Sequence, residues 1–220
     1  MKSIYRRMVR AQSRAGKSEE CLRGLGALRS ALAERVARGE LLTASAFAWG
    51  EQLFFYYECI EQPLEPEQLF GAVSDLLVEW PGGAAGRRFL PLMDIFHCVE
   101  PQGLEHWRRK RPPERVFARL ARLKPEMVGS YIFYHYQLQE ETPGSFDKYC
   151  LIGIHENLLF FYLEHPFVVE PPPAPGKLAT HNTPGHWQDV MDPHFDPWGE
   201  VAPDQRIWRD IQTVLTVGLG

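Results

Sequence analysis

The sequence has little of what marks a membrane, secreted or nucleic-acid-binding protein. No uninterrupted apolar run approaches the ~20 residues that a membrane-spanning helix needs. The first residues, MKSIYRRMVRAQSR, lack the apolar segment of a secretory signal. The net charge is only −4, so no broad attraction to nucleic acid or to an anionic membrane is expected. We therefore expect a cytoplasmic protein that binds neither nucleic acid nor membrane.

Motifs for metals, cofactors and disulfides are also missing. The 4 cysteines form no CxxC pair, which favours reduced, buried thiols. There is no phosphate-binding loop, nucleophile elbow or dinucleotide fingerprint, and we expect no cofactor. A group of His and Asp residues lies late in the chain without the spacing of a tight metal site, so no metal is expected: His181, His186, Asp189, Asp192, His194 and Asp196.

The chain is rich in apolar and aromatic residues, and one aromatic stretch occurs twice. Hydrophobic residues make up 45% and aromatic residues 12% of the 220 positions, enough to bury a core in one large domain or two smaller ones. GEQLFFYYE at 50–58 matches ENLLFFYLE at 156–164. The identical pairs are Leu53/Leu159, Phe54/Phe160, Phe55/Phe161, Tyr56/Tyr162 and Glu58/Glu164.

The flanking segments repeat in the same order. Each half opens with a strand-like segment and continues with a helix, a hairpin, a second helix and a closing strand. In the first half these are expected at 4–12, 18–39, 41–61 with a turn near Gly50–Gln52, 65–80 and 90–100. In the second half they are expected at 115–124, 125–141, 146–166 with a turn at Glu156–Asn157, 184–191 and 209–218. The order βαββαβ is typical of a ferredoxin-like unit.

The predicted fold class is therefore α+β, with two tandem ferredoxin-like repeats. Both faces of the aromatic hairpin strands are too apolar for water, so we expect the repeats to pack sheet to sheet as an intrachain α+β barrel. Residues 1–104 would be a degenerate scaffold repeat, 105–114 a linker with solvated basic charge, and 115–220 the candidate active repeat. An insertion at 166–185, rich in proline, is expected to act as a lid. The chain would be a monomer or a homodimer.

The segment YIFYHYQLQ is ambiguous on its own, because its aromatic and β-branched residues favour a strand. Its place in the repeat and Pro125 at its first turn favour a helix. On a helix, Tyr131 and His135 lie one turn apart on the same face.

These motifs resemble the L-rhamnose mutarotase family. The second half has Tyr131-x-x-x-His135 on the first helix, LLFFYLE from Leu158 and HWQDVM with Trp187 and Met191, in the family's order. The resemblance covers residues 115–217, with a weaker echo in 4–100. It implies a carbohydrate isomerase that interconverts the anomers of a small aldose, with a monosaccharide as its ligand.

Mutarotation needs an acid and a base on either side of the sugar. The expected catalytic residues are His135, Tyr131 and Glu164, and the expected substrate-binding residues are Tyr162, Trp187 and Phe160. In the first repeat, Tyr56 and Glu58 are expected to be core and rim.

A second interpretation stays open, because the aromatic wealth also suits a small-ligand-binding α+β barrel without catalysis or a monooxygenase-like relative. An open pocket on which Tyr131, His135 and Glu164 converge favours the sugar, whereas a closed apolar cavity favours the alternative.

Overall fold

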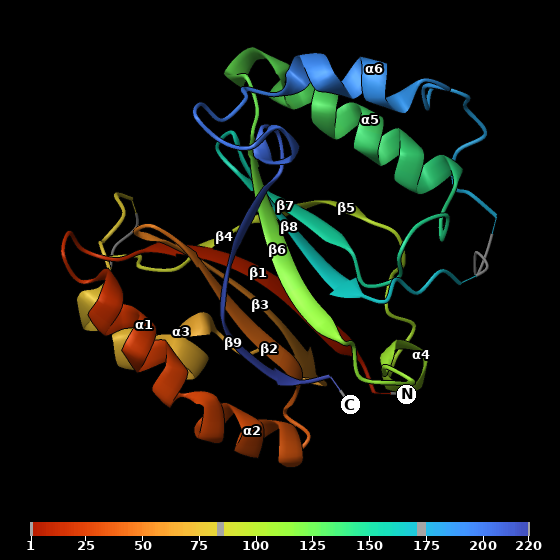
Figure 1. Cartoon of the computed structure of the whole chain (residues 1–220). Coiled ribbons are helices and arrows are strands. Elements are labelled where there is room, and N and C mark those ends of the chain that lie inside the picture. Colours follow the sequence, from red (N-terminus) through yellow and green to blue (C-terminus); the bar gives the residue numbers. More distant parts are fainter. Residues whose placement is uncertain (1, 83–85, 171–174, 220) are drawn as a thin grey trace. The chain divides into compact units, whose positions relative to one another are not determined.

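The structure is a computed structural model that describes residues 2–82, 86–170 and 175–219 (Figure 1). Its contacts divide the chain into two compact units. Unit 1 comprises Met1–Leu92, Pro101–Pro113 and Ile211–Gly220, and unit 2 comprises Met93–Glu100 and Glu114–Asp210. Each unit contains helices and an antiparallel sheet, so the predicted α+β class is confirmed at this level.

Unit 1 has a five-stranded antiparallel sheet in the order β4-β1-β3-β2-β9. Figure 1 shows helices α1, α2 and α3 together on one face of this sheet. The elements are β1 (Ile4–Gln12), α1 (Ser18–Ala27), α2 (Arg29–Ala37), β2 (Leu41–Trp49), β3 (Gln52–Ile60), α3 (Pro66–Phe70), β4 (Leu90–Pro91), α4 (Leu104–Trp107) and β9 (Arg209–Gly218).

The core of unit 1 lies between the sheet and its helices. Alternate residues of β3, among them Phe55 and Tyr57, join buried residues of α1 and α2 in one apolar cluster. Phe54 and Tyr56 point to the opposite face because side chains alternate along a strand. Both are also fully buried, which agrees with the expectation that neither face of this strand meets water.

Both helices predicted in the first half are shorter than expected. The helix expected over 18–39 is divided at Leu28, whose N–H bonds to the carbonyl of Leu25 three residues back and so interrupts the α-helical ladder. The helix expected over 65–80 ends at Phe70 and continues as a 3₁₀ turn over Gly71–Leu76. The turn at Gly50 is found as predicted, with a positive φ of 57° that favours glycine.

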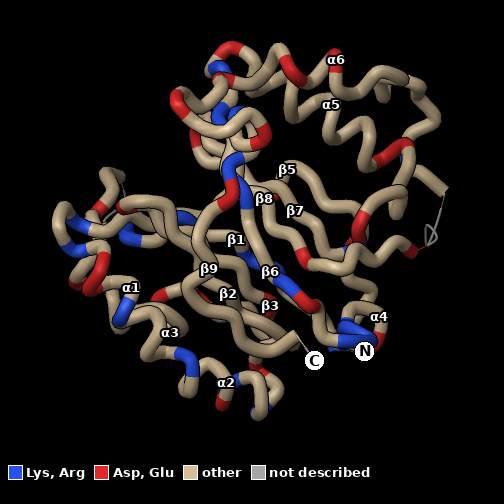
Figure 2. The backbone as a smooth tube through the Cα atoms, in the orientation of Figure 1, with Lys and Arg blue, Asp and Glu red and all other residues tan. Residues whose placement is uncertain are grey.

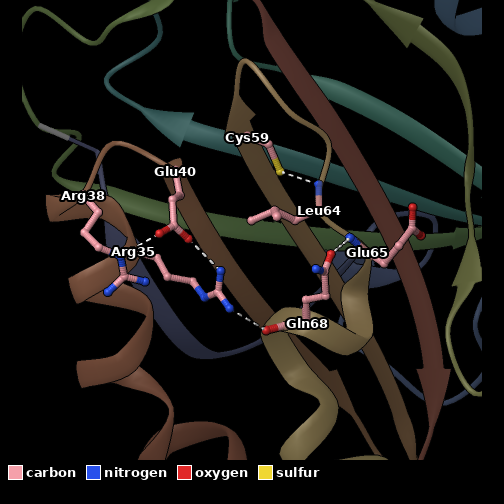
Figure 3. A network of polar contacts seen from close by, with 7 residues as sticks. All are labelled: Arg35, Arg38, Glu40, Cys59, Leu64, Glu65 and Gln68. Atoms are coloured by element: carbon pink, nitrogen blue, oxygen red, sulfur yellow. Dashed lines mark hydrogen bonds and ion pairs between the residues drawn. The ribbon is translucent and has the colours of Figure 1, made fainter.

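A polar network links the end of α2 to the start of β2 and to α3 (Figure 3). Arg35 and Arg38 donate to the carboxylate of Glu40 at 2.7 and 2.6 Å, and Arg35 also donates to the carbonyl of Gln68 at 3.3 Å. The hydrogen bond from Arg38 holds the pKa of Glu40 below its ordinary value. At α3, Glu65 and Gln68 form a capping box, and the Glu65 N–H donates to Gln68 Oε1 at 2.8 Å.

Unit 2 has a four-stranded antiparallel sheet in the order β6-β8-β7-β5. Helices α5 and α6 lie side by side over one face of it (Figure 1). The predicted helix at Tyr131 and the hairpin turn at Glu156–Asn157 are confirmed. The elements are β5 (Met93–His97), β6 (Arg115–Arg122), α5 (Val128–Glu141), β7 (Leu151–His155), β8 (Leu158–His165) and α6 (Trp187–Met191).

The closing strand of each half of the chain pairs, wholly or in part, with strands of the other half. The segment expected to close the first half is divided, because β4 pairs with β1 in unit 1 whereas β5 pairs with β7 in unit 2. The last strand of the chain, β9, pairs with β2 in unit 1 over Thr43–Ala48. Each unit therefore contains one strand from the other half of the chain. The predicted boundary between two sequence repeats, with a linker at 105–114, stays a prediction.

The linker expected at 105–114 does not carry only solvated charge. Arg109 is 6% exposed and forms an ion pair with Glu58, which is 0% exposed and was expected at a rim. The Trp107 indole N–H donates to Glu58 Oε1 at 2.8 Å, and the Tyr56 hydroxyl donates to the same carboxylate at 2.5 Å. A buried carboxylate needs such partners, so the interpretation of Arg109 as solvated linker charge is wrong.

Charges of both signs are spread along each unit (Figure 2). Strands β2 and β7 carry no Lys, Arg, Asp or Glu, and α5 carries charge only at its end, at Glu140 and Glu141. Within the described residues, no helix has the length and apolar character needed to cross a membrane.

Candidate functional site

Unit 2 contains an apolar cavity of about 170 Å³ between α5, α6 and the sheet. Tyr131 and His135, the two helix residues expected at the site, line it together with Trp187. Its lining is Phe96, Tyr131, His135, Leu138, Phe146, Cys150, Ile152, Phe161, Trp187, Gln188, Met191, Phe195 and Trp208.

Helix α5 brings Tyr131, His135 and Leu138 to the cavity because residues four and three apart share a helix face. The His135 ring meets the ring of Phe96 edge to face, with centroids 5.5 Å apart. The Gln139 side chain accepts a hydrogen bond from the His97 N–H at 2.9 Å, which fastens α5 to β5. These contacts position the imidazole on regular secondary structure.

His135 is a neutral hydrogen-bond acceptor towards the cavity. Its Nδ1 lies 2.9 Å from the carbonyl of Tyr131, which can only accept, so Nδ1 carries the proton. Burial lowers the pKa of His135 to about 4, and nearby His194 adds to this effect against the opposing Tyr131 carbonyl. Nε2 therefore keeps its lone pair at neutral pH, and among the described residues no donor is recorded for it.

The depressed pKa of His135 predicts a loss of stability in acid. From about pH 6.5 down to pH 4 the unfolded chain takes up this proton first, so the free energy of unfolding falls, by roughly 3 kcal/mol in all. Above pH 6.5 this histidine has no such effect. Denaturant unfolding at pH 7, 5.5 and 4 should show a smaller acid loss in His135→Gln than in the parent. The matched control is His181→Gln, an exposed histidine. Equal losses in all three proteins would contradict the prediction.

Tyr131 supplies a neutral phenol beside this imidazole. Its ring is tilted 31° to that of His135, with centroids 4.1 Å apart, and it is 1% exposed. Burial raises its pKa well above the ordinary value, so the hydroxyl keeps its proton. Among the described residues no partner is recorded for that hydroxyl. The cavity therefore offers one donor and one acceptor on the same helix face.

Apart from Gln188, the remaining walls are apolar. Trp187, the first residue of α6, packs edge to face on His135 with centroids 5.0 Å apart. Burial raises the pKa of the Cys150 thiol well above its ordinary value, so it stays a thiol and not a nucleophilic thiolate. The site is a mainly apolar pocket whose polar side chains are Tyr131, His135 and Gln188.

Glu164, Tyr162 and Phe160 do not join Tyr131, His135 and Trp187. Phe161 lines the cavity, and residues on either side of it in β8 face the other way because side chains alternate along a strand. On that face the Tyr162 hydroxyl donates to Glu164 Oε1 at 2.8 Å, and both residues are buried. The same Tyr–Glu contact occurs in β3, so the repeated residues share a local arrangement.

Most of the residues that line the cavity could not be identified from the sequence. Phe96 belongs to the predicted first half and reaches the site only because β5 pairs with β7. Phe195 and Trp208 follow the insertion, and their rings pack together with centroids 5.8 Å apart. Their aromatic character was the only signal available, and it does not distinguish a cavity wall from ordinary core.

The described part of the insertion is fastened to the end of α5. Asn182 and Thr183 donate backbone N–H groups to the Glu141 carboxylate at 2.8 and 3.1 Å, and the Thr180 hydroxyl donates to it at 2.8 Å. Hydrogen bonding to Thr183 and to its neighbours Asn182 and Thr180 lowers the pKa of Glu141 to about 2. Residues 171–174 of this predicted lid lie outside the described part of the chain.

Within residues 2–82, 86–170 and 175–219, no three His, Cys, Asp or Glu side chains are grouped so that they could hold a metal ion. Of the late group of histidines and aspartates, His194 is buried and its Nε2 lies 2.8 Å from the Ser130 hydroxyl.

Comparison with known proteins found no matching family model and no matching curated protein. Among solved structures, the chain aligns with a proposed monooxygenase from Lactobacillus acidophilus NCFM at 10% identity and a TM-score of 0.44, covering 99% of this chain and 97% of that one. A proposed monooxygenase from Fusobacterium nucleatum subsp. nucleatum ATCC 25586 aligns at 9% identity and a TM-score of 0.42, covering 99% and 94%. An anthrone oxidase-like protein aligns at 8% identity and a TM-score of 0.36, covering 99% and 97%.

The predicted kinship with L-rhamnose mutarotases is wrong, and with it the carbohydrate isomerase function. The aligned structures are named for oxidation chemistry and none is named a mutarotase. The site gives the physical reason: Glu164 lies on the opposite face of β8, which leaves no carboxylate on the cavity. A sugar's many hydroxyls would lose their water there without finding partners.

Proposed function

We propose that the cavity of unit 2 binds a small aromatic molecule that carries a hydroxyl group, and that the protein is a monooxygenase-like enzyme that oxidises this molecule with dioxygen. The observation that carries the proposal is the neutral His135 in an apolar pocket, with Nδ1 engaged by the Tyr131 carbonyl and Nε2 left as an acceptor. A ligand hydroxyl donates to Nε2, and the surrounding rings receive the aromatic face of the ligand.

For this oxidation the residues of the cavity need to position the ligand and to transfer one proton. In the overall reaction the aromatic molecule loses two hydrogens, one atom of dioxygen enters a ring carbon as a carbonyl oxygen, and the other atom leaves as water. His135 takes the hydroxyl proton as electrons leave the ring towards dioxygen, which makes that proton far more acidic. Tyr131 keeps its proton and donates a hydrogen bond to oxygen that gains negative charge. The mainly apolar lining lowers the local dielectric constant and so strengthens both interactions.

A second candidate function is binding of the same kind of molecule without turnover. It is favoured by the pKa of about 4 at His135, because so weak a base holds a ligand hydroxyl well but removes its proton poorly.

Replacing His135 with Gln is expected to slow oxidation by about 10²–10⁴-fold, the usual worth of a general base, while the dissociation constant for phenol changes much less. Tyr131→Phe should weaken both binding and rate. Calorimetric titration with phenol, 2-naphthol and L-rhamnose measures binding. An oxygen electrode with 2-naphthol and anthrone measures turnover.

The control is His181→Gln, an exposed histidine that does not line the cavity, which should match the parent. Phenol binding without oxygen uptake would support the second candidate function, binding without turnover, instead of the enzyme. Binding of L-rhamnose in preference to phenol, or oxidation unaffected by His135→Gln, would show that the proposed site is wrong.

We also propose the finer part of the predicted fold, in which two ferredoxin-like repeats pack sheet to sheet as an intrachain barrel. Its support is local: in both β3 and β8 the aromatic residues that point away from the helices, Phe54, Tyr56, Phe160 and Tyr162, are fully buried. Such residues need an apolar cover, because an exposed aromatic face of this size is costly in water.

A further inference from the structure

A second cavity of about 380 Å³ adjoins the first within unit 2. Three residues, Phe146, Cys150 and Phe161, line both cavities, so the two meet at this wall. The rest of the second lining comes from β6, β8 and the segments around residues 145 and 168: Phe117, Arg119, Ser145, Asp147, Leu163, Phe167 and Val169.

The volumes of the two cavities limit the size of the group that each can hold. An apolar cavity of about 150 Å³ holds one benzene molecule. The first cavity, at about 170 Å³, therefore fits a single aromatic ring beside His135. The second, at about 380 Å³, is more than twice as large and extends the space available beyond that ring.

The second cavity is lined mainly by apolar side chains, with Arg119, Ser145 and Asp147 as its polar members. Arg119 donates to Asp210 at 2.7 Å, and the Asp147 carboxylate accepts the Val168 N–H at 2.8 Å. Towards solvent it is bordered by exposed apolar side chains, with Phe167 57% and Val169 65% exposed. Such a border suits passage of an apolar group from water into the protein.

Phe146 stands where the two cavities meet. It is 48% exposed, and its ring is edge-on to that of Phe96 with centroids 6.2 Å apart. A side chain packed on one face only costs little to rotate, in contrast to the fully buried rings of the core.

We infer that the ligand is a phenol ring with an apolar extension, which runs from the first cavity past Phe146 into the second. The inference rests on the proposed function, because the phenol ring is placed by His135 and Tyr131. The extension is an alkyl chain or a further fused ring. Both share the chemistry that the second cavity accepts, which is apolar surface without charge.

A series of 4-alkylphenols from methyl to octyl tests the inference by calorimetric titration. Each buried methylene is worth up to about 0.8 kcal/mol, so the dissociation constant should fall by about two- to fourfold per added methylene until the second cavity is full. 2-Naphthol and anthrone form the fused-ring arm. Tighter binding than phenol for the alkyl series alone indicates that the extension is a flexible chain. Tighter binding for the fused rings alone indicates a rigid ligand.

Two variants block the second cavity without touching the first. Leu163→Trp fills it, and Val169→Asp places a charge at its exposed border. Each should reduce the gain per methylene by at least half and leave phenol binding unchanged. Val168→Asp is the matched control, because Val168 is also exposed but does not line the cavity. Val169→Asp alone decides the test if Leu163→Trp does not fold.

The outcomes separate the inference from the proposed function. If phenol binds and depends on His135, but longer alkyl chains and fused rings bring no gain, the inference is overturned and the proposed function stands. If the gain persists in both blocking variants, the extension lies elsewhere and the inference is again overturned. If no phenol in the series binds, the proposed function fails and the inference fails with it.

Discussion

Replacing Arg109 with Met is expected to lower the free energy of unfolding by about 3–5 kcal/mol, since removing one partner of a buried ion pair leaves the other charge uncompensated. The carboxylate of Glu58 is fully buried and accepts hydrogen bonds from both terminal nitrogens of Arg109, one of them at 2.9 Å. The hydrogen bonds from Trp107 and Tyr56 remain in the variant, but neither brings a positive charge. Denaturant unfolding at pH 7 measures the loss.

A neighbouring residue and a double variant provide the controls. Lys110→Met removes an exposed charge next to Arg109 and should change the stability by less than about 0.5 kcal/mol. Adding Glu58→Leu to Arg109→Met removes the unpaired charge and should recover part of the loss, because a buried pair is often replaceable by apolar groups. An Arg109→Met protein as stable as Lys110→Met would show that the ion pair contributes nothing.

Cutting the chain between residues 113 and 114 is expected to abolish folding of both fragments, and mixing them should restore it. Fragment 1–113 lacks β9, which pairs with β2 and buries Ile211, Leu215 and Val217. Each such side chain contributes about 1.5–3 kcal/mol, so their loss is comparable with the stability of a typical domain. Fragment 114–220 lacks β5, the edge partner of β7.

Circular dichroism and thermal melting of each fragment, and of the equimolar mixture, measure this effect. Fragment 1–113 with residues 209–220 attached through a flexible linker is the matched control, and it should gain helical and sheet signal over 1–113 alone. A cooperative melt in isolated 1–113 would contradict the exchange of strands between the units.

Local features of the fold were predictable. The two hairpin turns follow from sequence because the flanking strands have matched aromatic patterns, and Gly50 suits the positive φ of the first turn. The partners of the closing strands were not predictable, because a strand of alternating apolar residues suits more than one sheet.

The candidate site shows the same division. The i, i+4 spacing brought Tyr131 and His135 to one helix face, as expected. Glu164 was expected beside Tyr131 and His135 but lies on the other face of β8 from their cavity; both faces of that strand are buried, so the pattern does not tell which face meets α5. The mutarotase interpretation failed for a related reason: short aromatic motifs recur wherever a sheet is covered on both sides.

The sequence by itself determined the α+β class, the repeated aromatic strands, helix α5 and the Tyr131–His135 pair, because each is marked by a pattern within a short segment or by the repetition of that pattern along the chain. Only the tertiary structure decided which strands pair across the halves, that Arg109 is buried against Glu58, and that Phe96 completes the cavity beside His135. These depend on contacts between distant segments, whose choice rests on complementary packing and on the need of buried charge for a partner.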